Sequence, residues 1–375
     1  MKRALNWFPV ALGVLCLGLL AYPQRERAIR GQNDFVSFYT GAKLAGTPQL
    51  YSRAANLQVI QSILGFQMEG TTYIRPPFYA MLLKPLALLP YRAAWAMFFF
   101  ATLASVLWFV VRFSKECPAL PFFASLSIPL LTPLMNGQDT PFLLVILGAA
   151  ILLFRRGRDF AAGLVLSLCA LKFHLFLFLA LLLVMKKRWG AVKGGACGLA
   201  VLAVASLGEI GAWIQVLRDP WISPDPQNLP NLHGLILTLH GGLRAELGVV
   251  AMVAALFIIC ALKSDNFELL IAISIVCGLL ASFHSGPADD VLLLPVLVLA
   301  IASCTDAVVK TLSALVVTPI PYLMELAGSP YSAALPAMLL AWLVFAVRSA
   351  VAGVKLEVEK ADFMRGEPCA HPGES

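Results

Sequence analysis

Long apolar runs are the feature of this sequence that most constrains its fold. Three of them, ALNWFPVALGVLCLGLLAY (4–22), AAWAMFFFATLASVLWFVV (93–111) and ELLIAISIVCGLLASF (268–283), are each long enough to span a hydrocarbon core about 30 Å thick. Hydrophobic residues make up 59% of the chain and charged residues 13%, about half the charged share of a soluble domain. The sequence therefore predicts an all-α polytopic membrane protein.

The beginning of the chain and its cysteines exclude several other classes. MKR followed by an apolar run resembles a signal peptide, but the run is too long for a typical h-region and YPQRER offers no clean cleavage site, so we expect a retained first span. Most of the eight cysteines lie in apolar runs, where Cys acts as a small hydrophobe. We expect no disulfide framework and no cofactor. No Cys/His cluster has metal-ligand spacing, so we assign no metal ligands, although Asp289 and Asp290 leave a metal possible. The net charge of +7 does not indicate nucleic-acid binding, since basic residues in short loops orient the spans.

Basic residues flanking the apolar runs set the topology, because Lys and Arg gather on the cytoplasmic side of a membrane. Lys2 and Arg3 place the N-terminus inside, and Lys263, Lys310 and Arg348 fall on alternate span ends as this requires. We predict about twelve transmembrane or re-entrant helices, with both termini cytoplasmic. They cover 4–22, 94–111, 118–134, 140–154, 160–185 (two), 190–210, 248–262, 267–283, 291–303, 311–327 and 336–350.

The apolar stretch 160–185 is predicted to fold back on itself. It lies between the basic clusters RRGR (155–158) and KKR (186–188), which should both be inside. Its 26 residues could form one full span or two short half-helices, and the charge rule favours a re-entrant hairpin with LKFH (171–174) at the tip. Non-helical backbone at that depth is tolerated only inside protein or beside a watery cavity.

The rest of the chain forms outer segments and a tail. We expect one domain over 1–354, with a long first outer loop at 23–92 and a second, structured but non-helical one at 211–246, rich in Pro, Asn and Asp. The polar tail 355–375 should be disordered. Cations outnumber acids in 23–92, which could reflect contact with anionic headgroups or with a bound phosphate.

An acid stands where a membrane protein has little reason to keep one. Asp34 lies about a dozen residues after the first run ends at Tyr22, and aromatic and small residues follow it at helical spacing. It could cap a helix beginning at Phe35. Alternatively, an acid beside a membrane-level helix could act as a base on a substrate whose other half is lipid.

Two basic features could carry chemistry as well. Arg75 precedes an amphipathic, membrane-level segment in TYIRPPFYAMLLKPLALLPY (72–91), where it could also be an interfacial anchor. Lys172 and His174 lie at the predicted hairpin tip. Ionisable groups at membrane depth are costly and suggest a function, although Lys172 could snorkel to an interface.

Two polar loops complete the candidates. FHSGPADD contains His284 and the adjacent acids Asp289 and Asp290, which could be solvated caps for a helix at Val291. MNGQDT contains Asn136, Gln138 and Asp139, which could form a simple turn.

The predicted topology brings these features to the outer side, and the combination suits a phosphate-bearing lipid. Arg and Lys would bind the phosphate, and the acid would deprotonate an attacking hydroxyl. The chain has no Gly-rich phosphate loop and no soluble domain large enough for a nucleotide, so a membrane-borne activated sugar fits better than a nucleotide sugar. Our candidate base is Asp34. The candidate donor-phosphate or substrate-binding residues are Arg75, Lys172, His174, His284, Tyr39, Lys43, Gln138 and Asp290.

Several segments resemble glycosyltransferase family 87 in their order and spacing. NDFVSFYTGAKLAGTPQLYS resembles its opening signature, and IRPPFYAMLLKPLALLPYRAAWAMF its tyrosine/proline-proline segment, with Arg75 where Tyr is commoner. The stretch from NGQDT to KKRW is similar to its Gly-Gln and hairpin region, and FHSGPADDVLLLPVLVL to its late histidine segment. The resemblance covers about 33–299. His174 and the pair Asp289–Asp290 depart from the family pattern.

The resemblance implies a GT-C fold and an inverting transfer of a hexose, typically mannose, from a polyprenyl-phosphate donor. Asp34 matches the catalytic aspartate, Lys172 the hairpin lysine and His284 the late outer histidine. The implied setting is the outer face of a bacterial inner membrane, with membrane lipids around the protein and a lipid or glycan as acceptor. Two rival hypotheses are a lipid flippase or transporter using Lys172, His174 and Asp290, and a non-catalytic membrane subunit. No convincing inverted repeat supports the transporter.

Overall fold

The computed structural model describes residues 8–66, 68, 71–218 and 229–365, and every regular element within these ranges is helical. The first half contains α1 (Phe8–Ala21), α2 (Arg25–Arg30), α3 (Phe35–Leu44), α4 (Arg53–Leu64), α5 (Pro77–Leu83), α6 (Tyr91–Phe113), α7 (Leu120–Leu126), α8 (Ile128–Asn136), α9 (Thr140–Arg155) and α10 (Asp159–Leu166). The second half contains α11 (Leu177–Met185), α12 (Trp189–Val204), α13 (Ile210–Val216), α14 (Leu232–Thr238), α15 (Leu243–Lys263), α16 (Phe267–Ala281), α17 (Leu293–Ser303), α18 (Ala307–Leu315), α19 (Pro319–Leu326) and α20 (Ala334–Arg365). The all-α class predicted from the sequence is confirmed for this part of the chain.

Within the described ranges, four helical stretches are long and apolar enough to cross a membrane. They are Phe8–Leu44, Tyr91–Phe113, Leu243–Lys263 and Tyr331–Ala352, and the pair α18 and α19, bent by 50°, would add a fifth. The predicted count of about twelve is not confirmed, because several expected spans are short or broken. The expected span 118–134 breaks between α7 and α8 at Ser127, whose backbone is extended (φ −76°, ψ 109°), and α8 then begins with Pro129 in its first turn.

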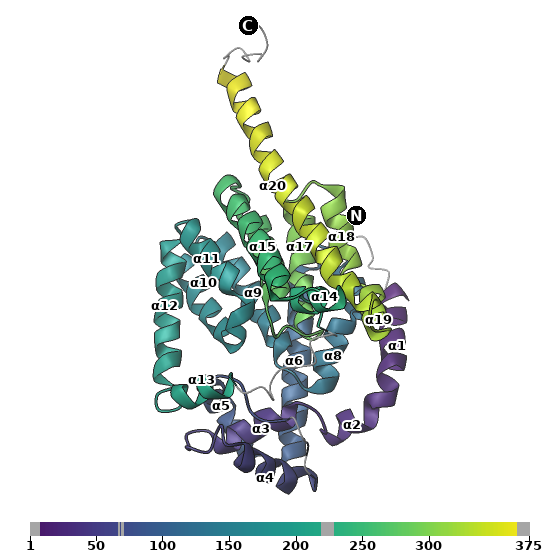
Figure 1. The fold of residues 1–375 in the computed structure, drawn as a ribbon, viewed down its shortest axis with the longest axis vertical. Helices are drawn as coiled ribbons and strands as arrows, with labels where there is room; N and C mark the ends of the chain where they lie inside the picture. The colour runs from purple at the N-terminus through teal and green to yellow at the C-terminus, as the bar shows by residue number, and fades with distance from the viewer. Residues whose placement is uncertain (1–7, 67, 69–70, 219–228, 366–375) are drawn as a thin grey trace.

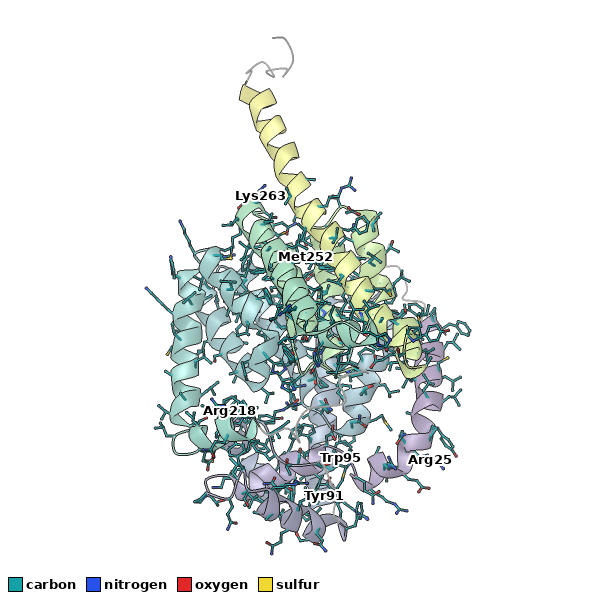
Figure 2. The ribbon with its side chains drawn as sticks, in the orientation of Figure 1. Arg25, Tyr91, Trp95, Arg218, Met252 and Lys263 are labelled. Atoms are coloured by element: carbon teal, nitrogen blue, oxygen red, sulfur yellow. The ribbon has the colours of Figure 1, made fainter. Side chains whose placement is uncertain are left out.

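The helices leave two differently built ends of the bundle. In Figure 1, α20 protrudes at one end, whereas α2 to α5 and α13 gather at the other. Figure 2 places Lys263 near the α20 end and Tyr91 at the opposite end. Ion pairs between helix ends connect α6, α9 and α16 through Arg155, whose guanidinium lies 2.6 Å from Glu268 and 2.8 Å from Glu116.

The segment 160–185 forms a hairpin-like unit of α10, a 3₁₀ helix η3 (Ser167–Leu175) and α11. Its two ends meet, because Arg188, just after α11, lies 3.1 Å from Asp159 at the start of α10. Lys172 interrupts η3 with non-helical backbone angles (φ −134°, ψ 56°). α12 packs closely along α10, since a Cβ on Gly163 would stand 1.9 Å from the Ala191 carbonyl oxygen. That this unit re-enters a membrane stays a prediction.

The elements of the first loop form a lobe around an aromatic core of their own. This core packs α3, α5 and the start of α6 together, and it contains the buried residues Phe35, Phe38, Tyr39, Tyr73, Tyr79, Trp95, Phe98 and Leu171. Since Leu171 belongs to η3, the lobe is built directly onto the tip of the hairpin. Its outer placement stays a prediction.

Two predicted irregular regions contain helices. The second loop, 211–246, contains most of α13, all of α14 and the first turn of α15, while 219–228 lie outside the described residues. The tail was expected to be disordered from 355, but α20 continues to Arg365, and 366–375 lie outside the described residues. Lys, Leu and Glu in KLEVEK are strong helix formers, which favours this continuation although the sequence there is polar.

Candidate active site

Asp34 precedes α3 but does not cap it. No hydrogen bond joins its carboxylate to the helix N-terminus; the side chain of Asn33 instead accepts a hydrogen bond from Phe35 N at 3.2 Å. The capping explanation considered from the sequence is therefore wrong. One carboxylate oxygen, Oδ2, accepts a hydrogen bond of 2.7 Å from Gln138 Nε2. The structure gives Oδ1 no hydrogen-bond partner among the described residues, so this oxygen can accept a proton.

Aromatic packing fixes the position of Asp34. The next residue, Phe35, is fully buried, and its ring centroid lies 4.8 Å from Phe98, 5.5 Å from Trp95 and 5.7 Å from Tyr91. The labelled Tyr91 and Trp95 of α6 lie together at the lobe end of the molecule (Figure 2). The sequence DF thus combines an acid with a buried anchor, and the anchor limits how far the acid can move.

The turn between α8 and α9 meets Asp34 through both backbone and side chain. Asp34 N donates to the Asn136 carbonyl at 2.9 Å, in addition to the bond from Gln138. Gly137 makes this turn possible, because it adopts φ +65° and an added Cβ would lie 2.7 Å from the Trp95 ring. The stretch MNGQDT does form a turn, as the simpler explanation proposed, but the turn also belongs to the site.

Arg75 makes a two-point ion pair with Asp139, the residue that precedes α9. Its Nε lies 2.8 Å from Oδ2 and its Nη2 3.0 Å from Oδ1. The Asp139 side chain is completely buried, whereas the Arg75 side chain keeps 16% exposure. Asp139, like Asp34, makes no capping hydrogen bond at its helix. Two helix-terminal aspartates therefore direct their carboxylates to groups of the site.

The Lys172 ammonium has partners on the 3₁₀ helix η6 (Asp289–Leu292) and at the start of α9. It contacts Asp289 of η6, lies 3.3 Å from Thr140 Oγ1 of α9, and lies 3.9 Å from Asp139. The side chain is 5% exposed, so the snorkelling explanation does not describe this structure. Burial of a cation requires such compensation, because an unpaired charge in an apolar interior is costly.

Two histidines stand beside this cluster. The rings of His174 and His284 are 6.5 Å apart, and His174 Nε2 is buried without a hydrogen-bond partner among the described residues. His284 lies in the loop after α16. Partial burial lowers the pKa of His284, because the imidazolium loses hydration there, and nearby His233 adds to this effect. His284 is therefore a neutral imidazole at pH 7, able to donate one hydrogen bond and accept another.

Three predicted site residues have other environments. The Tyr39 hydroxyl donates to the Leu89 carbonyl at 2.6 Å, and exposed Lys43 lies over the Tyr39 ring at 5.3 Å. Asp290 is buried, and neither of its carboxylate oxygens has a hydrogen-bond partner among the described residues. No hydrogen bond or ion pair described by the structure joins these side chains to Asp34 or Arg75. Their role in substrate binding stays a prediction.

The sequence reasoning did not assign roles to the two acids that organise the cluster. The sequence pattern places Asp139 in a turn and Asp289 in a possible helix cap. A signal was available for one of them: Lys172, predicted at membrane depth, requires an acid of opposite charge nearby. The sequence could not show which acids, because the partners lie 64 and 117 residues away along the chain.

An apolar cavity of about 370 Å³ lies against the same hairpin. Both arms of the hairpin and α12 line it, and its wall includes Cys169, Ala170 and Phe173, which flank the Lys172 kink on either side. Its volume is within the range of small-molecule pockets, and its lining is almost entirely hydrocarbon. Among the described residues, no group of three or more His, Cys, Asp or Glu side chains is arranged to hold a metal ion.

Comparison with known proteins identifies the family. The model of "Glycosyltransferase family 87" matches residues 73–286, which is more than half of the chain. The match includes Arg75, Gln138, Asp139, Lys172 and His284, and it begins after Asp34. Neither the curated proteins nor the solved structures contain a match. With its apolar helices and this match, the chain belongs to glycosyltransferase family 87 and is a membrane glycosyltransferase.

Proposed function

We propose that this enzyme transfers a hexose, mannose in the simplest case, from a polyprenyl-phosphate donor to a hydroxyl of a lipid or glycan acceptor, with inversion at the anomeric carbon. The reaction takes place at the outer face of a bacterial inner membrane, with both termini in the cytoplasm. The observation that carries the proposal is the Asp34 carboxylate, which accepts a hydrogen bond from Gln138, does not cap α3, and has one oxygen that no described residue hydrogen-bonds.

The proposed step needs one base and one leaving group. Asp34 Oδ1 accepts the proton of the acceptor hydroxyl while that oxygen attacks the anomeric carbon from the face opposite the phosphate. The bond between the anomeric carbon and the phosphate oxygen breaks, and the electron pair leaves with the polyprenyl phosphate. Configuration is inverted because a single displacement occurs, and no second carboxylate has to act as nucleophile.

The phosphate meets a cluster whose charges are already balanced. Arg75 is paired with Asp139 and Lys172 with Asp289, so neither cation carries an uncompensated positive charge that would bind a phosphate by itself. Arg75 Nε and Nη2 are engaged with Asp139, which leaves Nη1 for a phosphate oxygen. His174 and His284 can donate N–H groups to the same phosphate. In this proposal Lys172 offsets negative charge from a short distance rather than binding the phosphate alone.

The apolar cavity supports a lipid-borne donor over a nucleotide sugar. A hydrocarbon chain in this cavity would place the attached phosphate near the Lys172 kink, because the cavity wall includes residues on both sides of that kink. Apolar lining stabilises such a chain at roughly 25 cal/mol per Å² of buried area. A nucleotide has no comparable partner there.

The test is sugar transfer by the full-length protein in lipid nanodiscs with radiolabelled polyprenyl-phosphate mannose and membrane acceptors. Asp34→Asn keeps the shape and the acceptor for Gln138, and we expect it to lower the rate about 10²–10⁴-fold. Asp159→Asn, at the other end of the bundle, is the matched control and should retain activity. Equal product from wild type and Asp34→Asn, or none from either, would refute the proposal. Transport of the same lipid in proteoliposomes without transfer would favour the flippase.

A further inference from the structure

We infer that Asp139 is a positioning residue, which orients the side chain of Arg75 and thereby presents its remaining nitrogen to an anionic substrate. The inference rests on the proposed function only for the identity of that substrate. Neither the sequence resemblance nor the family match assigns a role to Asp139.

Asp139 holds Arg75 at two points, while its other cationic neighbour, Lys172, is more distant at 3.9 Å. Both carboxylate oxygens face Arg75, at 2.8 Å and 3.0 Å, in the parallel arrangement that fixes the plane of a guanidinium. An aspartate before a helix would ordinarily cap it, yet Asp139 makes no such bond with α9. Its carboxylate is completely buried, so solvent cannot compete with Arg75 for it.

The backbone of Arg75 is fixed independently of Asp139. Tyr51 Oη donates to the Arg75 carbonyl at 2.8 Å, and Trp213 Nε1 donates to the preceding carbonyl, of Ile74, at 3.0 Å. Arg75 is also preceded by buried Tyr73, whose N–H donates to Asn56 at 3.0 Å. What Asp139 determines is therefore the side chain, whose several rotatable bonds would otherwise be free.

The same turn sets the distance between cation and base. Gln138 binds Asp34 and the next residue, Asp139, binds Arg75, so two consecutive side chains connect to opposite parts of the site. α9 begins immediately afterwards, and its first residue, Thr140, contacts Lys172. A substitution at Asp139 should consequently disturb donor binding through Arg75 without touching the reacting atoms.

The first experiment measures the freedom of Arg75 without any substrate. Full-length protein in nanodiscs is treated with phenylglyoxal, and modification of Arg75 is followed by peptide mass spectrometry. We expect Arg75 to react at least about tenfold faster in Asp139→Asn than in wild type, because a lost bidentate pair releases the guanidinium. Asp139→Glu should fall between them. Glu268→Gln, which breaks a similar pair of Arg155 at the other end, should leave Arg75 reactivity unchanged.

The second experiment measures donor kinetics on a double-mutant cycle. We expect Asp139→Asn to raise KM for polyprenyl-phosphate mannose about 10–100-fold, with a smaller change in kcat. In Asp139→Glu, KM should lie between the values of Asp139→Asn and the wild type. If Asp139 acts through Arg75, Asp139→Asn should cost nothing further in an Arg75→Gln background. If Asp139→Asn does not fold because Arg75 is left unpaired, the double variant Arg75→Gln/Asp139→Asn is compared with Arg75→Gln alone.

The two experiments separate the inference from the proposed function. Unchanged Arg75 reactivity in Asp139→Asn, or losses that multiply in the double variant, would overturn the positioning role even in an active enzyme. Faster modification of Arg75 in a protein that transfers no sugar from this donor would support the positioning role and refute the proposed donor.

Discussion

Two arginines at opposite ends of the bundle make nearly the same contact in different surroundings. Arg155 pairs with Glu268 through Nε and Nη2, just as Arg75 pairs with Asp139. The acid differs: the Glu268 side chain is 29% exposed, whereas the Asp139 side chain is fully buried. Water screens the partly exposed pair, which therefore stabilises the fold little. Loss of either partner from the buried pair would leave an uncompensated charge in the interior.

The difference supports the proposal that the site lies at the lobe end of the molecule. At the α20 end, ion pairs join helix ends that also carry the basic residues predicted to face the cytoplasm. At the lobe end, Arg75, Lys172, Asp139 and Asp289 form a buried chain of alternating charges beside Asp34. A buried ionic cluster is often no more stabilising than hydrocarbon of equal volume, so its presence suggests a role other than stability.

The largest stability effect is expected from breaking the buried cluster at Lys172. Lys172→Met keeps the length of the side chain but leaves Asp289 buried without its cation. We expect a loss of about 3–5 kcal/mol, because an uncompensated buried charge is left behind. Thermal unfolding in detergent would show this as a large decrease in Tm.

The double variant Lys172→Met/Asp289→Asn distinguishes charge from packing. If the uncompensated carboxylate causes the loss, removing both charges should restore most of the stability. A double variant as unstable as Lys172→Met would mean that the packing of η3, and not its charge, determines the stability there.

The two glycines flanking α9 offer a matched pair for the next effect. Gly137 and Gly157 both adopt left-handed backbone, with φ of +65° and +68°. Alanine at either site has an unfavourable backbone conformation, about 1–2 kcal/mol. Only at Gly137 would the new methyl also collide, at 2.7 Å from Trp95 and 2.8 Å from Phe35, while Gly157 faces open space.

We therefore expect Gly137→Ala to cost about 2–4 kcal/mol and Gly157→Ala about half as much. Gly137→Ala should also reduce sugar transfer, because the turn that binds Asp34 has to shift. Denaturation curves in the same detergent would compare the two variants. Equal losses of stability in the two variants would mean that the turn at Gly137 can shift to accommodate the methyl group. The lobe end would then be no more tightly packed at this turn than the α20 end.

A smaller effect is expected at the exposed arginine pair. Glu268→Gln removes one of the two acids of Arg155 and leaves Glu116 at 2.8 Å. We expect a loss below about 1 kcal/mol that shrinks further at high salt, because solvent screens this pair. Tm measured at low and high ionic strength would test it. A loss as large as that of Lys172→Met would contradict the expectation that the partly exposed pair stabilises the fold less than the buried cluster does.

How far the sequence could predict this molecule depends on the range of the interaction. Local rules identified the helical class and the turn at MNGQDT, since each follows from neighbouring residues. The hairpin with Lys172 at its tip was predicted instead from the basic clusters at the two ends of 160–185. Local rules also placed Asp34 before a helix, but the capping rule chose the wrong partner, because Gln138 competes for the carboxylate from 104 residues away. Span lengths were overestimated where prolines and extended residues such as Ser127 interrupt apolar runs.

The smallest predicted effect concerns His284 and the pH dependence of stability. Burial holds the pKa of His284 below its usual value near 6.5, so the folded protein keeps this imidazole neutral where the unfolded chain is already protonated. The contribution of His284 to stability is therefore complete above about pH 6.5 and decreases as the pH falls through the lowered pKa. We expect His284→Gln to make the fall in the free energy of unfolding at acid pH smaller by roughly a few tenths of a kcal/mol, because the His284 side chain is exposed and water screens the effect. Tm measured against pH would show this as a slightly shallower acid limb. His284→Gln leaves all the acids of the ion pairs in place. If Tm falls at acid pH as steeply in this variant as in the wild type, protonation of those carboxylates, and not of His284, causes the loss of stability.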